Sequence, residues 1–466
     1  MMRLRFLVVL WACKLVARLI QWFFPQRGTN QSGKIALRLM PGFLDAFRGI
    51  VPARTIFVTG TNGKSTSNNL IVHAFRTSGK TVATNLEGAN LVSGVATTLI
   101  KNSTLSGWMS KDYLILEVDE RTLPRVRRSL PGGFLCVTNL QKDQVQRNGD
   151  PDYIYRKILS AIGQDVTVFV NNEEPRTASL ARAAGRSVSF GVARNERSFA
   201  AASPDHAVVS GEEPTVDPYA VTMPCPLCHD ALGFSYYNLA GVGPFHCRKC
   251  GFSSADTPDY QVGRVDFRAR RFAINRHDFH LEYDAAPFLY NYALCAAVAG
   301  EFGIGEADLD RAFRTFTNVG GRLEEFAFRN KKVCYVRIKQ ENPETLQSAL
   351  DTIAADPGEK VFALGLEIVR DIIPNYNNTS YAFDVSFDRL LATPVETCVC
   401  YGKTNCYDVA VRLLYAGFPE DKIVLVDSDE PADIFDAIAR CRPERAYLVT
   451  LLGQYEVLSR YVKRRA

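Results

Sequence analysis

Short apolar runs separated by helix-length segments predict an alternating α/β chain. In the first two thirds these runs include TIFVT (55–59), YLILE (113–117), FLCV (134–137), residues 166–170 and SVSFGV. The last third repeats the rhythm with VCYVRI (333–338), VFALGL, TCVCYG, KIVLVD and AYLVTLL. Apolar runs of this length between helix-like segments are typical of buried parallel strands with crossover helices. We therefore expect a parallel sheet in each part of the chain.

The stretch TIFVTGTNGKSTSNNL at residues 55–70 predicts a phosphate-binding loop. The apolar run ends at Gly60, and a helix is expected to begin just after Gly63, so that backbone N–H groups and the helix dipole face an anion. Lys64 is expected to reach the phosphates of a nucleoside triphosphate, and the Ser65 hydroxyl to bind Mg²⁺. The predicted nucleotide-binding residues are Gly60, Thr61, Asn62, Gly63, Lys64, Ser65 and Thr66. A glycine–lysine turn that binds nothing is the alternative, because Val58 stands where the common pattern has its first glycine.

Polar side chains follow the next two predicted strands. Glu117, Asp119 and Glu120 end the first of them, and Asn139 ends the second, with Asp143 close behind. Parallel strands bring such ends together at one edge of a sheet. We expect Glu117 to hold Mg²⁺ directly or through water. The alternative is a carboxylate that only satisfies the end of its strand.

Four of the twelve cysteines form two Cys-x-x-Cys pairs, CPLC and CRKC. They are Cys225, Cys228, Cys247 and Cys250. Two such pairs separated by 18 residues have the spacing of a structural Zn²⁺ ribbon, in which four thiolates surround one tetrahedral ion. A redox pair or an iron–sulfur cluster is the alternative. The other eight cysteines lie in apolar runs, where core thiols are expected.

Charge is unevenly distributed along the 466 residues, a length that suggests about three domains. Residues 1–44 hold seven Lys or Arg and no acid, whereas the remainder holds 48 Lys or Arg against 50 Asp or Glu. The body is therefore close to neutral, which argues against a general nucleic-acid-binding surface.

The basic N-terminal segment contains the apolar stretch FLVVLWACKLVARLIQWFF, residues 6–24. A spanning helix would bury Lys14 and Arg18 near the bilayer centre, which is unfavourable. A helix in the membrane interface, with these cations toward anionic lipid heads, is one interpretation. A helix docked on the protein's own body is the other. A secretory signal is less favoured, because no small-residue cleavage site follows.

Motifs along the chain resemble one family. GTNGKST, LEVDE, NLQKDQVQRNG, the four-cysteine ribbon, NYALCAA and NVGGRLEEF occur in the order found in the MurT family of Mur-ligase-like proteins. The resemblance implies a Mur-ligase-type P-loop central domain with an inserted four-cysteine zinc ribbon and a Rossmann-like C-terminal α/β domain. It implies ATP, Mg²⁺ and structural Zn²⁺, with the adenine near Asn291 and Arg322 closing the ATP site.

The same resemblance gives the expected domain boundaries. Residues 1–48 form a basic amphipathic segment. Residues 49–320 form the ATP-binding domain, with the ribbon at about 222–256. Residues 321–466 form the C-terminal domain, which docks the partner.

The implied partner is a GatD-like class I glutaminase subunit. The family's Ser-Trp-Ile-Trp-Asp motif corresponds to SYAFD at residues 380–384, so Asp384 is the acid expected to complete the partner's glutaminase triad. The preceding NYNNT is shorter than in the family and lacks its acidic residues. The alternative is that Asp384 only caps a helix, and Asp371 is then the next candidate.

The implied reaction amidates the D-glutamate α-carboxylate in the stem peptide of lipid II. It uses ATP, an acyl phosphate and ammonia from the glutaminase, in the cytoplasm and at the inner face of the membrane. Two rival functions stay open. One is a stand-alone Mur or folylpolyglutamate-type amino acid ligase, and the other is a zinc-ribbon NTPase that binds nucleic acid.

Overall fold

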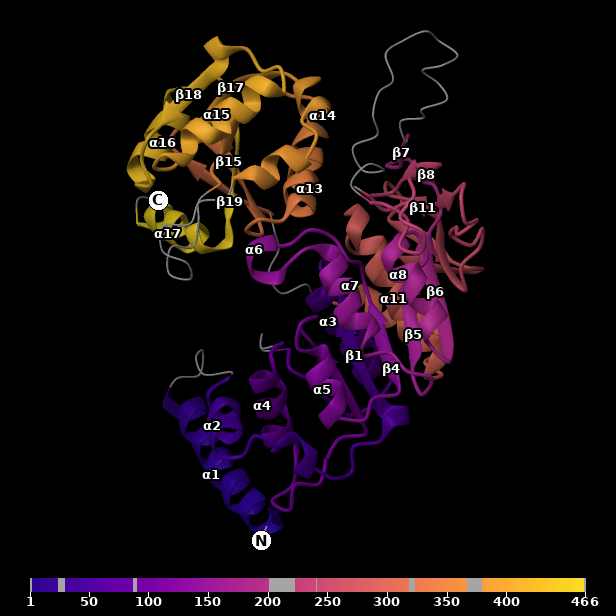
Figure 1. Ribbon diagram of the computed structural model, residues 1–466. Coiled ribbons are helices and arrows are strands. Elements are labelled where there is room, and N and C mark those ends of the chain that lie inside the picture. Colours follow the sequence, from indigo (N-terminus) through magenta and orange to yellow (C-terminus); the bar gives the residue numbers. More distant parts are fainter. Residues whose placement is uncertain are drawn as a thin grey trace. The chain divides into compact units, whose positions relative to one another are not determined.

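The computed structural model describes residues 2–23, 30–86, 90–200, 223–239, 241–317, 323–366 and 379–464 (Figure 1). The chain divides into two compact units. The first unit comprises Met1–Gln141 and Pro151–Thr317, and the second comprises Lys142–Asp150 and Asn318–Ala466. The short segment Lys142–Asp150 thus leaves the first unit and belongs to the second.

A nine-stranded sheet in the order β13-β12-β11-β6-β5-β4-β1-β3-β2 forms the centre of the first unit. Its strands are β1 (Thr55–Thr59), β2 (Val82–Ala83), β3 (Tyr113–Glu117), β4 (Phe134–Val137), β5 (Thr167–Asn171), β6 (Arg186–Val192), β11 (Tyr260–Asp266), β12 (Arg271–Ile274) and β13 (His277–His280). The strands from β2 to β11 pair in parallel, and β12 and β13 add an antiparallel edge. The parallel sheet expected from the sequence is confirmed.

Both faces of this sheet are buried, because alternate side chains of each strand enter different cores. Ile56 and Val58 pack on one face with helices α3 (Lys64–Thr77), α11 (Ala286–Glu301) and α12 (Glu306–Thr315). Phe57, between them, packs on the other face. The helices on that side include α4 (Val92–Asn102), α5 (Leu123–Ser129), α7 (Pro151–Leu159) and α8 (Pro175–Leu180).

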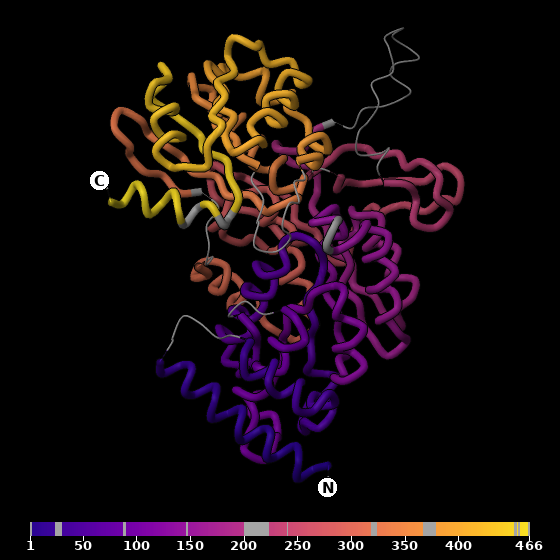
Figure 2. The backbone as a smooth tube through the Cα atoms, turned by 60° about the vertical axis from the view of Figure 1, so that its left-hand side comes forward, coloured from indigo at the N-terminus to yellow at the C-terminus, as the bar shows by residue number. Residues whose placement is uncertain are grey.

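Helix α1 (Met2–Phe23) runs along the outside of this unit (Figure 2). One side of α1 packs on the second core together with α2 (Gln31–Leu39). The buried residues of α1 are Phe6, Val9, Leu10, Cys13 and Ala17. The interpretation of a helix docked on the protein's own body therefore holds for this side.

Lys14 does not point away from the protein as the lipid-facing interpretation required. Its ammonium donates to the carbonyl oxygens of Ile100 and Ser103, the latter at 2.6 Å. These carbonyls lie at the C-terminal end of α4, where cations are favoured by the helix dipole. Arg18, one turn further along α1, is exposed.

The cysteine-containing insertion carries short antiparallel pairs. Strand β8 (Leu232–Phe234) pairs with β10 (Phe245–Cys247), and β7 (Phe199–Ala200) pairs with β9 (Tyr236–Tyr237). A small core that includes Leu232 and Phe245 surrounds the cysteines. This core is too small to hold the insertion alone.

The second unit has its own six-stranded sheet in the order β14-β15-β19-β16-β17-β18. The strands are β14 (Leu323–Phe328), β15 (Lys331–Ile338), β16 (Lys360–Leu364), β17 (Val395–Tyr401), β18 (Ile423–Val426) and β19 (Arg445–Leu451). All pairs are parallel except the β14–β15 hairpin. The five apolar runs expected as strands are therefore confirmed, but the edge strand β18 leaves Val424 and Leu425 exposed.

Helices cover both faces of the second sheet. Helices α13 (Pro343–Ala354) and α15 (Asn405–Tyr415) pack on one face, and α16 (Pro431–Arg440) and α17 (Leu452–Lys463) on the other. Short helices α6 (Val145–Asn148) and α14 (Asp388–Leu391) complete the unit.

Candidate functional site

The phosphate-loop candidate connects β1 to the first turn of α3. Gly60 and Gly63 adopt φ values of +122° and +78°, in the region that favours glycine. A Cβ at Gly60 would collide with the Thr138 side chain and with the Asn139 carbonyl. The loop therefore lies against the end of β4, and both glycines are required by its geometry.

Asn139 fixes the shape of this loop. The backbone N–H of Thr61 donates to the Asn139 carbonyl at 2.8 Å, and that of Asn62 donates to Asn139 Oδ1 at 2.9 Å. Asn139 Nδ2 in turn donates to the Asn62 carbonyl at 3.0 Å. The polar end of β4, noted in the sequence, thus supports the loop from behind.

Lys64 lies folded over the loop. Its ammonium bonds Glu120 Oε1 at 2.7 Å, the Thr61 carbonyl at 3.2 Å and the Gly60 carbonyl. The side chains of Lys64 and Glu120 are each 11% exposed, so this ion pair is only partly screened by water. The first turn of α3 places Ser65 in the open, with its hydroxyl accessible.

Glu117 ends β3 directly beside β1, in register with Val58. Its Oε1 accepts a 3.3 Å hydrogen bond from Asn90, and its backbone is held by the Asn85 side chain. The Ser65 hydroxyl and the Glu117 carboxylate are the hard oxygen donors that Mg²⁺ prefers. Ser65 lies on the helix that follows β1, and Glu117 ends the strand that pairs with β1. The residues present therefore fit a Mg²⁺ site.

Asp119 is engaged elsewhere. Burial raises the pKa of its carboxyl, but the hydrogen bonds and charge of Arg121 outweigh burial and leave that pKa lowered. Arg121 contacts Asp119 with Nε at 3.0 Å and Nη2 at 2.8 Å. Asp119 is thus an ionised partner of Arg121.

Asn291 lies beneath the loop, on α11. Its Oδ1 accepts from the Ser67 hydroxyl at 2.9 Å, and a Cβ at Gly63 would meet the same oxygen at 2.9 Å. Asn291 is 6% exposed. The structure therefore brings Asn291 to the loop, whereas its role toward adenine stays a prediction. Arg322 lies outside the described residues.

A polar hollow of about 240 Å³ opens beside α4. It is lined by Gln21, Arg76, Val82, Thr84, Asn85, Gly94, Thr97, Thr98, Lys101 and Asn102. Asn85 connects this hollow to Glu117, because it bonds the Glu117 backbone. The hollow is thus next to the candidate Mg²⁺ site and carries two cations, Arg76 and Lys101.

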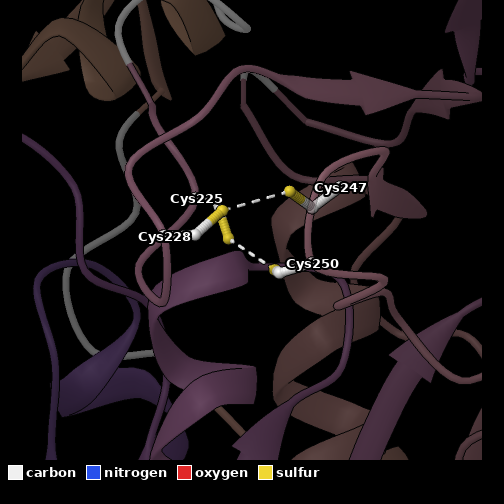
Figure 3. Close-up of side chains that lie close together, drawn as sticks. All are labelled: Cys225, Cys228, Cys247 and Cys250. Atoms are coloured by element: carbon white, nitrogen blue, oxygen red, sulfur yellow. Dashed lines mark hydrogen bonds between the residues drawn. The ribbon is translucent and has the colours of Figure 1, made fainter.

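The four predicted metal cysteines come together (Figure 3). Cys225 and Cys250 have their sulfurs 3.6 Å apart, Cys228 and Cys247 3.5 Å apart, and all four sulfurs lie within 4.8 Å of one another. A tetrahedral ion with Zn–S bonds of about 2.3 Å requires S···S separations of about 3.8 Å. The cluster therefore fits one Zn²⁺.

Backbone groups favour the thiolate form of one cysteine in the cluster, Cys247. Backbone N–H groups, first that of Cys250 and then that of Lys249, lower the pKa of Cys247 to about 7. Of the other eight cysteines, seven are buried and Cys441 is half-buried, as expected of core thiols. Burial raises the pKa of Cys295, among them, and makes it unreactive.

The two residues that directly follow β5, Asn172 and Glu173, connect the cysteine-containing insertion to the main sheet by hydrogen bonds. Asn172 exchanges hydrogen bonds with the backbone of Ala255 at 2.8 and 2.9 Å. Glu173 accepts from Asn238 at 2.9 Å, from Tyr290 and from the Val192 backbone. Burial raises the pKa of Glu173 to about 7, although these hydrogen bonds act in the opposite direction. The sequence analysis missed this anchor. Its only signal was the polar run NNEE directly after an apolar strand.

Asp384 ends a short 3₁₀ turn, Ser380–Asp384, in the second unit. Its Oδ1 accepts from Lys142 Nζ at 2.7 Å, and the two side chains are about one third exposed. Tyr381 of the same turn is buried, whereas Phe383 is 54% exposed. Asp384 is accordingly an accessible, ionisable carboxylate next to an exposed aromatic ring. Asp371 lies outside the described residues.

The segment that carries Lys142 is fixed on this unit. Asn342 donates to Asp143 Oδ1 at 3.0 Å, and the backbone N–H of Gln144 donates to the Glu341 carbonyl at 3.0 Å. Asp143 and Gln144 therefore hold this segment on the second unit and position Lys142.

An apolar stripe on α15 lies close to the Asp384 turn. Its members are Tyr407, Val411, Leu414 and Tyr415, between 44% and 80% exposed and spaced as one face of a helix. The ring of Tyr415 meets Phe383 edge-on at 6.2 Å, and the Arg412 guanidinium lies 5.3 Å from the same Phe383 ring. We call these five exposed side chains, Phe383 included, the α15 stripe.

Comparison with known families gives two matches. Residues 58–216 match the Mur ligase middle domain, and residues 340–456 match the MurT ligase C-terminal domain. The first match begins within β1 and contains the phosphate loop. The second contains Asp384 and α15.

Curated relatives match along most of the chain. It is 25% identical over 428 residues to the MurT subunit of lipid II isoglutaminyl synthase (glutamine-hydrolyzing) from Staphylococcus aureus strain COL, which covers 91% of this chain and 90% of the relative. The corresponding Streptococcus pneumoniae R6 subunit is 25% identical over 411 residues, covering 85% and 84%.

Solved structures share the fold. A pseudomurein peptide ligase type C from Methanothermus fervidus superposes with a TM-score of 0.62 at 16% identity, covering 91% of this chain and 80% of the other. MurF from Acinetobacter baumannii gives 0.59 at 13% identity, covering 92% and 80%. The fold and the phosphate loop are thus those of a Mur ligase. A C-terminal domain that matches the MurT ligase model and MurT relatives that match along most of the chain confirm the resemblance that the sequence motifs indicated.

Proposed function

We propose that this chain is the ATP-dependent synthase subunit of a lipid II isoglutaminyl synthase. In this role it amidates the α-carboxylate of D-glutamate in the lipid II stem peptide and uses ammonia made by a glutaminase partner. The observation that carries the proposal is the combination of a Mur-type phosphate loop in one unit with a MurT-type C-terminal domain in the other.

The phosphate loop supports the activation step. A carboxylate oxygen forms a bond to the γ-phosphorus of ATP while the bond to ADP breaks, and Lys64 offsets the charge that develops on the phosphate oxygens. Mg²⁺ held by Ser65 and Glu117 would add further neutralisation of the phosphates. Lys64 must exchange its contact with Glu120 for the phosphates, and both are charged groups within reach of solvent.

The amidation step needs no nucleophile from this chain. Ammonia attacks the acyl carbon, phosphate leaves with the former carboxylate oxygen, and the attacking nitrogen loses a proton to solvent. The polar hollow beside Glu117 suits the anionic substrate, because Arg76 and Lys101 line it.

The second unit supports a role in binding the glutaminase. An exposed carboxylate beside an apolar stripe is the arrangement expected when one protein completes a catalytic site in another. Asp384 would hold the catalytic imidazole of a GatD-like partner in the correct tautomer, and the α15 stripe would provide the apolar centre of the interface.

The cysteine cluster supports a structural role for Zn²⁺. Four thiolates leave no open coordination position for a substrate. The ion would therefore stabilise the insertion, whose anchors Asn172 and Glu173 follow a strand of the ATP-binding sheet. The proposed location is the cytoplasm, at the inner face of the membrane where lipid II is exposed.

Reconstituted activity distinguishes this proposal from its rivals. The purified chain with ATP, lipid II and ammonium should yield amidated lipid II without a partner, whereas glutamine should serve only when the glutaminase is present. An amino acid joined to the substrate, with no need for ammonia, would instead indicate a stand-alone ligase. ATP turnover that responds to nucleic acid and not to lipid II would indicate the NTPase.

A further inference from the structure

The side of α1 that faces away from the protein carries a long apolar stripe. Its exposed hydrophobic residues are Met2, Leu4, Val8, Trp11, Leu15, Leu19, Trp22 and Phe23. From Leu4 to Trp22 they follow helical spacing, which forms a stripe about 27 Å long at 1.5 Å per residue. We call this stripe, together with Leu105 and Trp108 of the neighbouring loop, the tryptophan face.

The loop at Leu105 and Trp108 belongs to this face because α1 holds it in place. Trp11 Nε1 donates to the Leu105 carbonyl at 2.8 Å, and Arg3 donates to the Ser106 carbonyl. Leu105 and Trp108 are 66% and 54% exposed. The apolar surface thus extends beyond a single helix.

All three tryptophans of the chain belong to α1 or to the loop that α1 contacts. Trp11, Trp22 and Trp108 are 48%, 79% and 54% exposed, although tryptophan is usually well buried in a soluble protein. An apolar ring with one polar N–H suits the boundary between acyl chains and headgroups.

The opposite side of α1 determines how the helix can lie. Phe6, Leu10 and Cys13 are completely buried in the core of the first unit, and Lys14 is bonded to the end of α4. Although α1 is long and apolar enough to cross a membrane, leaving this core would expose large apolar side chains of its neighbours. The helix therefore presents its long side to the surroundings and keeps its packing.

The positive charge of the N-terminal segment indicates which kind of surface covers the tryptophan face. Residues 1–44 contain seven cations and no acid, and Arg5 and Arg18 are exposed beside the apolar stripe. A second copy of the chain would bring the same cations against each other, with no carboxylate in the segment to offset them. An anionic lipid surface complements this charge.

We propose that the tryptophan face is a membrane-docking surface, which lies in the headgroup region of an anionic bilayer with α1 parallel to the membrane plane. The proposal does not depend on the proposed enzymatic function, since docking requires neither ATP nor a glutaminase. Basic residues flanking an apolar helical face produce binding that combines apolar burial with electrostatic attraction.

Intrinsic fluorescence provides a direct test, because every tryptophan reports on this face. Vesicles of phosphatidylcholine with phosphatidylglycerol should shift the emission of the intact protein to shorter wavelength, and the protein should float with them. Pure phosphatidylcholine vesicles, or high salt, should weaken both effects. Unchanged emission and no flotation with anionic vesicles would overturn the proposal.

A double substitution on α1 tests whether the tryptophan face is the surface that binds vesicles. Leu15→Glu and Leu19→Glu together should reduce vesicle partitioning by about tenfold or more, because both side chains are exposed and their loss leaves the core intact. Tyr153→Glu, also at an exposed site in the first unit, is the matched control and should bind vesicles normally. Equal binding by the double variant would overturn the proposal.

Two further results would also contradict it. Sedimentation showing a dimer that Leu15→Glu dissociates, without vesicle binding, would identify a second copy as the occupant. Membrane association of the intact protein that resists alkaline and high-salt washing would identify a spanning helix.

Discussion

At the scale of single residues, the account depends on a few charged side chains with identifiable partners. Lys64 is held by Glu120 at the phosphate loop, and Lys142 holds Asp384 in the other unit. Neither pair is fully buried, so each can separate when a ligand or partner arrives. The residues that shape the loop, Gly60 and Asn139, are fixed by backbone geometry instead.

Lys64→Ala tests the phosphate loop. Removing a cation that stabilises developing phosphate charge should lower ATP-dependent amidation at least about 100-fold. The fold should survive, because the ammonium bonds the rim of the loop and Glu120 and is not part of the apolar core. Lys111→Ala, at an exposed lysine before β3, is the control. Amidation at the wild-type rate by Lys64→Ala would show that this loop is not the ATP site.

Asp384→Asn tests the assignment of the triad acid. Loss of the carboxylate that orients a catalytic imidazole can lower glutamine hydrolysis by about 10⁴-fold. Amidation with free ammonium should persist, because the ATP site is in the other unit. Asp388→Asn, four residues later and exposed, should hydrolyse glutamine normally. A stable complex of the Asp384→Asn variant with full glutaminase activity would refute the assignment.

At the scale of elements, the cysteine-containing insertion and the exposed face of α15 are not required to form the two main sheets. The insertion has only a small core of its own, and α15 keeps a row of apolar side chains in solvent. The small core of the insertion indicates that a bound ion stabilises it. The exposed apolar row of α15 indicates that a partner covers it.

Cys225→Ser should unfold the insertion without removing a catalytic group. Binding of Zn²⁺ by four thiolates contributes roughly 10 kcal/mol or more in small zinc domains, and this contribution is lost with one ligand. Elemental analysis should find one zinc per wild-type chain and little in the variant. Cys441→Ser, outside the cluster, should retain zinc. Iron, or no metal, in the native protein would contradict the assignment.

Val411→Glu on the α15 stripe should weaken binding of the glutaminase. A charge at the centre of an apolar interface typically costs about 2 kcal/mol or more, or about 30-fold in Kd. Val457→Glu, equally exposed on α17 of the same unit, is the matched control. Isothermal titration with the partner measures both, and equal affinities would place the interface elsewhere.

The sequence predicted these elements because their signals are local. Glycine spacing, strand patterning and paired cysteines each lie within a few residues, which is why the phosphate loop and cysteine cluster were found. The anchor at Glu173 was missed because its partners Asn238 and Tyr290 are 65 and 117 residues away. The sequence left two interpretations open for Lys14, because helical spacing shows which residues share a face, but not which face meets the protein; the structure places Lys14 against the end of α4.

At the scale of the whole molecule, the chain distributes one reaction over two compact units. The first contains the phosphate loop, the candidate Mg²⁺ ligands and the insertion with the four-cysteine cluster. The second contains Asp384 and the α15 stripe, and it includes Lys142–Asp150 from the middle of the first unit's sequence. Because the chain crosses between the units at both ends of this segment, it connects the ATP-binding unit covalently to the unit proposed to bind the glutaminase.

The central claim is that this chain activates a carboxylate with ATP before ammonia enters. It is tested most directly with lipid II whose D-glutamate α-carboxylate carries oxygen-18, incubated with the purified chain, ATP and ammonium. Mass spectrometry of the products should find one labelled oxygen in the inorganic phosphate for each amide formed, because the acyl phosphate passes that oxygen to phosphate. Amide formation with unlabelled phosphate, or ATP cleavage to AMP, would contradict the account.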